Sequence, residues 1–360
     1  MQKYKVGVVG ATGMVGQRFL TLLAEHPWFE VVTLAASPRS AGKSYAEAVA
    51  GRWAMAEPMQ QKFADMLLVD ASNVEAVTAK VDFVFCAVDM PKDQIRALEE
   101  AYAKAETPVV SNNSANRYQI DVPMMIPECN AEHMAVIPLQ RKRLGTARGF
   151  VTAKPNCSIQ SYVPALTPLR DFGIEKISVC TYQAISGAGK TFERWPEMVD
   201  NVIPYIGGEE LKSEIEPLKI WGALTEGGIE PAKSPVISAQ CYRVAVADGH
   251  MAAVSVQFAK KPSMDEMKAR WAAFKGLPQQ YGLPSAPGRF LTYFEEPDRP
   301  QSRLDRDIEH GMGVCIGRLR EDPLFDYRFA CLSHNTLRGA AGGAVLTAEL
   351  LCHEGWIEHK

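Results

Sequence analysis

The sequence predicts an α/β fold in two parts: a doubly wound parallel sheet, followed by a second domain of the α+β type. Three observations carry this prediction. The chain opens with a strand, a glycine-rich turn, a helix and a second strand, which together form a βαβ unit. Strand-like and helix-like segments then alternate through the first part of the chain. Farther along, runs with a period of two indicate a mixed or antiparallel sheet.

The opening unit has the spacing of a dinucleotide site. Residues 4–9 read as a buried strand and residues 30–35 as a second one. The turn between them carries Gly10, Gly13 and Gly16, followed by a helical pattern. Glycine lets the backbone approach a pyrophosphate, and the helix start offers N–H donors to it. The alternative is a tight packing turn without a ligand.

The end of the second strand indicates which dinucleotide would bind. An NAD site usually places an acidic residue there to hold the ribose 2′-hydroxyl. This chain has Ser37, Arg39 and Ser40 instead, and no acid. Because a guanidinium matches a phosphate, we predict NADP in preference to NAD. Arg39 could also be an ordinary surface charge.

The first domain continues with strand-like runs at residues 66–69, 82–88 and 108–111 and a helix at 92–104. The loop at 111–117, which includes Asn112 and ends in Arg117, directly follows a strand. Ligands of such sheets bind beyond the carboxyl ends of the strands, so this loop could hold a phosphate or carboxylate. It could equally be a surface turn, since Asn and Ser are common in turns.

Cys157 stands between a strand expected at 149–153 and a helix expected at 158–170. A thiol at a helix N-terminus faces unpaired N–H groups and the positive end of the helix dipole, and both favour the thiolate. Pro155 and Asn156 are signals for a helix start. This placement predicts a nucleophile, whereas many free cysteines are small buried hydrophobes.

The second domain has strand-like runs at residues 176–184, 251–258, 313–319 and 327–332. Residues 276–301 read as an irregular excursion, and residues 335–351 as a small-residue helix that packs back on the first domain. Three segments carry reactive side chains: 183–190, 207–212 and 241–250. A histidine in the last of them, His250, could act as acid or base, and Arg243 could clamp a carboxylate. Each could also be a surface residue.

Composition excludes several classes. The net charge of −3 gives no reason to expect nucleic acid or an anionic membrane as a partner. No apolar run approaches the ~20 residues of a membrane helix, and the first residues lead directly into a strand, so we expect no signal peptide. None of the eight cysteines forms a CxxC pair, which argues against a structural zinc site or a dithiol redox motif, and no metal is expected. A reducing cytoplasm is expected.

Eight motifs in order resemble those of the aspartate-β-semialdehyde dehydrogenases of archaea, fungi and some bacteria, over nearly the whole chain. They are GATGMVG at 10–16, SPRSAGK at 37–43, the SN…R loop at 111–117, PNCS at 155–158, QAISGAG at 183–189, NVIPYIGGEELK at 201–212, RVAVADGH at 243–250 and HNTLRGAAGG at 334–343. Two positions depart from the family pattern: Lys154 stands where Asn is common, and Ala245 where Pro is common.

The resemblance implies an architecture like that of glyceraldehyde-3-phosphate dehydrogenase. Residues 1–155, with the C-terminal helix 336–360, would form a Rossmann-like NADP-binding domain. Residues 156–335 would form a catalytic and dimerisation domain, so a homodimer or homotetramer is expected.

The resemblance also assigns roles. Cys157 would be the nucleophile and His250 the general acid/base. The substrate would be bound by Gln183, by Arg243 at its α-carboxylate, by Glu209 near its amino group, by Arg117 and Lys212 at its phosphate, and by Asn112. The NADP site would be lined by Gly10, Thr12, Gly13, Met14, Val15, Ser37, Arg39, Ser40, Ser186, Gly187 and Asn335.

The implied reaction is the NADPH-dependent reductive dephosphorylation of L-4-aspartyl phosphate to L-aspartate 4-semialdehyde through a Cys157 thioester. This step belongs to lysine, threonine and methionine biosynthesis. Two other functions remain open on the sequence: an acyl-CoA reductase of the malonyl-CoA type, and a non-catalytic NADP-binding redox sensor. Arg243 and Gln183 argue against the sensor, which needs no carboxylate clamp.

Overall fold

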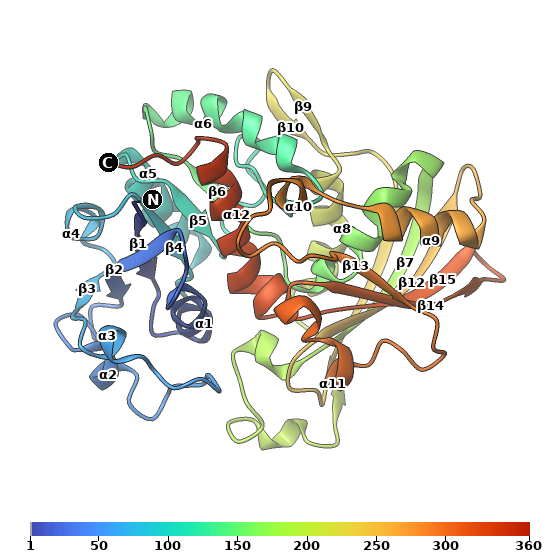
Figure 1. Cartoon of the computed structure of the whole chain (residues 1–360), viewed down its shortest axis with the longest axis horizontal. Coiled ribbons are helices and arrows are strands. Elements are labelled where there is room, and N and C mark those ends of the chain that lie inside the picture. The colour runs from blue at the N-terminus through green and yellow to red at the C-terminus, as the bar shows by residue number, and fades with distance from the viewer. Residues whose placement is uncertain (1) are drawn as a thin grey trace.

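The computed structural model, described here for residues 2–360, has two sheets with helices packed around them (Figure 1). The first sheet has six parallel strands in the order β3-β2-β1-β4-β5-β6. Its strands are β1 (Tyr4–Val9), β2 (Phe29–Ala36), β3 (Leu68–Asp70), β4 (Phe83–Cys86), β5 (Val109–Ser111) and β6 (Val151–Ala153). The strand order reverses between β1 and β4, and a crevice for a ligand is expected at such a point.

Helices lie beside this sheet on both faces, as the doubly wound prediction requires. They are α1 (Met14–Leu23), α2 (Tyr45–Ala48), α3 (Gln61–Ala64), α4 (Val74–Thr78), α5 (Lys92–Lys104), the 3₁₀ segment η1 (Ala131–Val136) and α6 (Ile137–Leu144). The C-terminal helix α12 (Gly342–His353) shares its buried apolar side chains with β1, α1 and β4 in one core. The expected contact of the last helix with the first domain is therefore present.

The second sheet is mixed and has seven strands in the order β13-β14-β15-β12-β7-β11-β8. The pairs β11–β7 and β13–β14 are parallel, and the other pairs are antiparallel. Its strands are β7 (Ile174–Gln183), β8 (Val202–Ile203), β11 (Val236–Val244), β12 (His250–Phe258), β13 (Leu291–Phe294), β14 (Val314–Glu321) and β15 (Tyr327–Ser333), and a separate hairpin is formed by β9 (Ala223–Thr225) and β10 (Gly228–Glu230).

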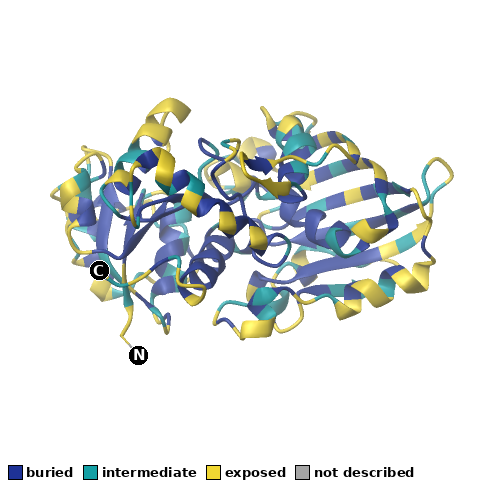
Figure 2. Cartoon of the chain, turned by 90° about the horizontal axis from the view of Figure 1, so that it is seen from above, coloured by how far each residue is buried: buried dark blue, intermediate teal, exposed yellow. Residues whose placement is uncertain are grey.

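One face of the second sheet is covered and the other is largely exposed (Figure 2). Buried side chains on the covered face pack against the helical segments as a second core. These segments are η2 (Ser158–Gln160), α7 (Val163–Leu166), η3 (Thr167–Phe172), α8 (Glu209–Ile220) and α9 (Met264–Ala273). The remaining helical turns are η4 (Ile185–Ala188), η5 (Pro196–Met198), α10 (Leu277–Tyr281), α11 (Ser302–Asp305), η6 (Ile308–Gly311) and the π-helical η7 (Leu337–Ala341).

The expected helix over residues 158–170 is wrong. The chain forms three short segments there, the 3₁₀ turns η2 and η3 with one turn of α-helix, α7, between them. Pro164 and Pro168 lie in this stretch, and proline has no N–H to donate to the helical ladder. The α-helix dipole invoked for Cys157 is therefore absent.

Two further expectations need correction. The excursion at residues 276–301 contains α10 and the edge strand β13, which pairs in parallel with β14. The helix expected over 335–351 begins as the irregular turn η7, in which Ala340 has a non-helical backbone, and becomes regular from Gly342. Within residues 2–360, no helix combines the length and apolarity needed to cross a membrane.

Candidate active site

Each of the three glycines of the first turn lacks a side chain for a different structural reason. Gly10 has φ +85°, and a side chain there would collide with the carbonyl of Ala87. A Cβ on Gly16 would lie 2.3 Å from the carbonyl oxygen of Gly10, so helix–strand packing requires this glycine. A Cβ on Gly13 would meet nothing closer than 3.6 Å. Packing thus does not explain Gly13, whereas the approach of a ligand to the start of α1 does.

A cavity of about 560 Å³ opens beside this turn, at the point where the strand order reverses. It is lined by Gly10, Thr12, Gly13 and Ser37, with the chain after β3 and β4 and one face of α5. Arg39 and Ser40 follow on the same loop after β2, and Arg39 is exposed. The size and position of the cavity fit the adenosine half of a dinucleotide.

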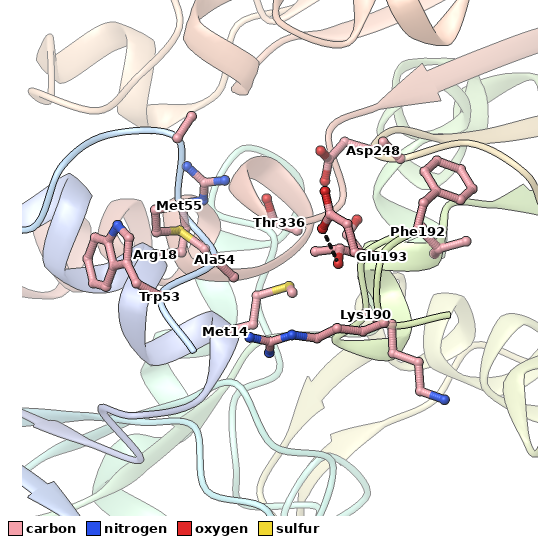
Figure 3. A pocket seen from close by; sticks show the side chains of 16 residues that line it. Met14, Arg18, Trp53, Ala54, Met55, Lys190, Phe192, Glu193, Asp248 and Thr336 are labelled. Atoms are coloured by element: carbon pink, nitrogen blue, oxygen red, sulfur yellow. Dashed lines mark hydrogen bonds between the residues drawn. The ribbon is translucent and has the colours of Figure 1, made fainter. Parts of the chain in front are cut away.

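A second cavity of about 480 Å³ lies between the two parts of the molecule (Figure 3). Met14 and Arg18 of α1 line one side, while Ser186 and Lys190, from the segment after β7, line the other. Two predicted cofactor residues, Met14 and Ser186, therefore face a common space although they come from different domains. Val15 is partly buried against the first core.

Cys157 is partly exposed, immediately before η2. Gly339 packs closely against Cys157. A Cβ on Gly339 would lie 2.9 Å from the Cβ of Cys157, so this contact needs glycine. Desolvation and the charge of Glu209 raise the pKa of the thiol, while Lys154, Arg117 and Arg243 oppose the increase. This differs from the sequence expectation of a helix terminus that favours the thiolate.

Glu209, at the start of α8, binds three side chains of the site. It accepts hydrogen bonds from Asn156 Nδ2 (3.0 Å), Gln183 Nε2 (3.0 Å) and Lys212 Nζ (2.7 Å). Although desolvation opposes it, Lys212 and these hydrogen bonds hold the pKa of Glu209 below its usual range. Glu209 is therefore an anion that orients Gln183 and the residue before the thiol.

His250 is fully buried at the start of β12, and β12 contacts η2, which follows Cys157. The Ala184 N–H donates to His250 Nδ1 (3.1 Å), so in the neutral ring the proton is on Nε2. Nε2 has no hydrogen-bond partner among residues 2–360. Desolvation and Arg243 lower the pKa of His250 to about 3. The imidazole is a neutral donor with its N–H available.

Arg243 and His250 converge on Gly187. A Cβ at Gly187 would lie 2.9 Å from His250 Nε2 and 3.0 Å from Arg243 Nη1. Arg243 Nη1 also donates to the Ala184 carbonyl (2.7 Å), which fixes the guanidinium. The Arg243 guanidinium, the neutral Nε2–H of His250 and the backbone of Gly187 therefore lie next to one another.

Asn335 connects the predicted cofactor residues to His250. Its Nδ2 donates to Ser186 Oγ (2.8 Å), and its Oδ1 accepts from the N–H of Gly249 (2.8 Å), the residue before His250. Ser186, Asn335 and the imidazole therefore form one connected unit at the boundary between the domains.

Arg117 is already engaged by the protein. It donates to the carbonyls of Lys154 (2.8 Å) and Asn112 (3.2 Å) and forms a buried ion pair with Glu216 (2.9 Å). These contacts use three of its five N–H groups. Both polar side-chain atoms of Asn112 are buried without a hydrogen-bond partner in the described part of the chain, residues 2–360, which marks a place where a ligand could bind.

From the sequence, Glu216 has no expected role, and Asn156 is expected only as a helix-start signal within PNCS. Glu216 also accepts from the Asn156 N–H (2.6 Å), so it supports both Arg117 and the turn before the thiol. Helical spacing could have indicated it, because Glu209, Lys212 and Glu216 recur on one face of α8. Among residues 2–360, no group of three or more His, Cys, Asp or Glu side chains could hold a metal ion.

Comparison with known proteins agrees with this geometry. Two family profiles match: "Semialdehyde dehydrogenase, NAD binding domain" over residues 5–137, and "Semialdehyde dehydrogenase, dimerisation domain" over residues 166–338. The aspartate-semialdehyde dehydrogenase of Archaeoglobus fulgidus is 45% identical over 98% of this chain and 99% of its own length. That of Aspergillus fumigatus is 42% identical over 99% of both chains.

A solved structure agrees as well. The crystal structure of aspartate semialdehyde dehydrogenase with NADP from Candida albicans superposes with a TM-score of 0.89, at 37% identity, over 99% of this chain and 100% of that one. The resemblance and the fold class expected from the sequence are thereby confirmed. This chain belongs to the aspartate-semialdehyde dehydrogenase family.

Proposed function

We propose that this chain catalyses the NADPH-dependent reductive dephosphorylation of L-4-aspartyl phosphate to L-aspartate 4-semialdehyde, and the phosphate-dependent oxidation in reverse. One observation carries the proposal: the neutral His250 imidazole and the fixed Arg243 guanidinium converge on Gly187, next to Ser186, which lines the cavity between the two parts of the molecule, and the charge of Arg243 acts on the partly exposed thiol of Cys157. Family membership supports the same reaction.

The charges of the site match those of the substrate. Arg243 would bind the α-carboxylate, and Glu209, which is anionic, would lie near the amino group. Asn112 and the free N–H groups of Arg117 would hold the phosphate, together with Lys212. Arg117 would contribute mainly well-placed N–H donors, because its positive charge is already compensated by Glu216.

Cys157 would act as a nucleophile in a covalent step. The thiolate attacks the acyl carbon, the C–S bond forms, the C–O bond to phosphate breaks, and phosphate leaves with the electron pair. Covalent catalysis divides one difficult transfer into two easier ones. After reduction of the thioester carbon, the C–S bond breaks and the sulfur is again a thiolate.

His250 would stabilise the oxygen of the reacting carbonyl. Its Nε2–H is available because Nδ1 accepts from Ala184, so it can donate a hydrogen bond as negative charge develops on that oxygen. Bound substrate anions would raise the pKa of the imidazole from its low value, which improves its capacity to exchange protons.

The residues of the first domain fit NADP. Gly13 has no side chain where a pyrophosphate would approach, and Arg39 is an exposed cation after β2, where a 2′-phosphate would lie. Met14, Ser186 and Asn335 would contact the nicotinamide half. The cofactor supplies the hydride that reduces the thioester carbon.

One assay tests the proposed reaction. The purified chain is mixed with L-aspartate 4-semialdehyde and NADP, with and without inorganic phosphate, and NADPH is followed by its absorbance. We expect sustained turnover only with phosphate. Turnover that requires coenzyme A in place of phosphate would instead indicate an acyl-CoA reductase, and NADP binding without any turnover would indicate a redox sensor.

The exposed face of the second sheet supports a homodimer. Tyr182 of β7 is exposed there and stacks on Tyr242 of β11, and Val236 of β11 and Val202 of β8 are also exposed. An apolar face of this kind suits a second copy of the chain, and the matched profile is that of a dimerisation domain. A mass of one chain in equilibrium sedimentation would contradict this. We propose the cytoplasm as the compartment.

A further inference from the structure

Glu99 is a fully buried carboxylate of α5 to which the proposed mechanism gives no role. Its Oε1 accepts hydrogen bonds from Ser111 Oγ and from Asn113 Nδ2 (2.9 Å), and its Oε2 accepts from Asn116 Nδ2 (2.7 Å). All three donors belong to the loop 111–117 at the end of β5. Burial of a carboxylate is unfavourable unless it is hydrogen-bonded, so Glu99 and the conformation of this loop stabilise each other.

These hydrogen bonds decide which asparagine of the loop is left for a ligand. Ser111 and Asn113 stand on either side of Asn112, and both bind the same oxygen of Glu99. The Asn113 N–H also donates to Ser111 Oγ (3.0 Å), which closes a turn around Asn112. Both neighbours of Asn112 are therefore fixed by Glu99, and the side chain of Asn112 itself has no hydrogen-bond partner within residues 2–360.

The side chain of Asn112 depends on Glu99 more than Arg117 does. The main chain of Asn112 is held by its N–H, which donates to the Cys86 carbonyl (2.8 Å), and by its carbonyl, which accepts from Arg117 Nη2 (3.2 Å). The Arg117 guanidinium has separate support from its buried ion pair with Glu216. For the side chain of Asn112, the contacts of its two neighbours with Glu99 provide the corresponding support.

We propose that Glu99 is a positioning residue that directs Asn112 toward the phosphate of the substrate. The proposal rests on the reaction proposed above, in which Asn112 takes part in phosphate binding. Glu99 acts without touching the substrate: it fixes Ser111 and Asn113, and these two residues set the orientation of Asn112 between them. The face of α5 that lines the adenosine cavity does not include Glu99, so NADP binding should not depend on it.

Loss of the carboxylate would release the loop. Desolvation raises the pKa of Glu99, while the hydrogen bonds from Ser111, Asn113 and Asn116 act in the opposite direction. In Glu99→Leu these three donors lose their common acceptor. Because an unpaired buried donor is unfavourable, the loop must rearrange to satisfy them, and Asn112 moves with its neighbours.

Steady-state kinetics of the oxidation measure this effect, with inorganic phosphate varied at saturating L-aspartate 4-semialdehyde and NADP. In Glu99→Leu we expect the KM for phosphate to rise at least about tenfold while kcat changes by less than about threefold. Glu99→Gln keeps an acceptor oxygen for Ser111 and Asn113, so its KM should stay within about threefold of the parent value. An unchanged KM for phosphate in folded Glu99→Leu would overturn the proposal.

The matched control is Glu100→Leu. Glu100 is the next residue of α5, carries the same charge and pairs with Arg143. Its replacement should leave the KM for phosphate unchanged, and a rise equal to that of Glu99→Leu would contradict a role specific to Glu99. Absence of phosphate-dependent turnover in the parent chain would instead overturn the proposed reaction, so the two failures are distinct.

A double-mutant cycle separates positioning of Asn112 from a general loss of structure. In a chain that already carries Asn112→Ala, Glu99→Leu should raise the KM for phosphate by less than about threefold, because the side chain that it positions is gone. A full tenfold effect in that background would contradict the proposal.

A milder variant covers the case in which Glu99→Leu does not fold. Asn113→Ala removes one hydrogen bond to Glu99 at a partly exposed position. We expect it to raise the KM for phosphate about threefold, with the Kd for NADP unchanged. A KM for phosphate equal to that of the parent would overturn the proposal.

Discussion

At the scale of single residues, the chemistry of the site depends on the reactive side chains of His250 and Cys157. It depends equally on the hydrogen bonds and charges that set the protonation state of these two side chains. His250 was expected from the sequence as the acid/base. Its tautomer follows from the N–H of Ala184, which is 66 residues away in the chain. No local pattern could have indicated that contact. The same holds for Cys157, whose pKa is raised by desolvation and by Glu209 from another helix.

Gly187 offers a direct test of this local arrangement. In Gly187→Ala the new Cβ would lie 2.9 Å from His250 Nε2 and 3.0 Å from Arg243 Nη1, so both side chains must move. We expect kcat/KM to fall by about 10²-fold, since displacements of about 1 Å have effects of that size. The matched control is Gly227→Ala in the β9–β10 hairpin, where the nearest atom is 3.7 Å away. Equal activity of the two variants would contradict the assigned geometry.

The sequence indicated the side chains with distinctive chemistry and missed those that hold them. Cys157, Arg243 and Gln183 stand in recognisable motifs. Glu216 stands in none, and Asn156 stands in PNCS with no expected role in the site, because the importance of both comes from hydrogen bonds between segments far apart in the chain. The positions of such partners are set by tertiary packing.

At the scale of elements, the prediction was accurate where local sequence determines structure. The strand β1 and the helix α5 have the predicted bounds. The stretch after Cys157 is different, because Pro164 and Pro168 interrupt a helical hydrophobic pattern. Its short turns are buried in the second core, so packing stabilises them where hydrogen bonding alone would not.

Two glycine substitutions in the turn before α1 test the packing of the fold and the binding of NADP separately. Gly16→Ala places a methyl group 2.3 Å from the Gly10 carbonyl, and we expect it to destabilise the fold by about 1–3 kcal/mol. Gly13→Ala meets no close atom, so its melting temperature should stay near that of the parent while its Kd for NADP rises at least about tenfold. Thermal melts and NADP titrations measure both. Tight NADP binding by Gly13→Ala would contradict the placement of the pyrophosphate.

At the scale of the whole molecule, the two sheets are connected by residues from the end of the chain. Arg338 is fully buried and forms a two-pronged ion pair with Glu128 at 2.7 and 2.9 Å. The segment that follows backs Cys157 at Gly339 and then continues as α12 into the first core. The sequence indicated that this helix returns to the first domain. It could not indicate that the same return path supports the thiol.

The central claim, an acyl group carried by Cys157, is tested most directly by a single-turnover measurement. L-aspartate 4-semialdehyde and NADP are mixed rapidly with the chain in the absence of phosphate. We predict a burst of about one NADPH per active site. An aspartyl adduct should appear on the Cys157 peptide and disappear when phosphate is added. Full phosphate-dependent turnover by Cys157→Ser, or a burst with no adduct on that peptide, would contradict the account.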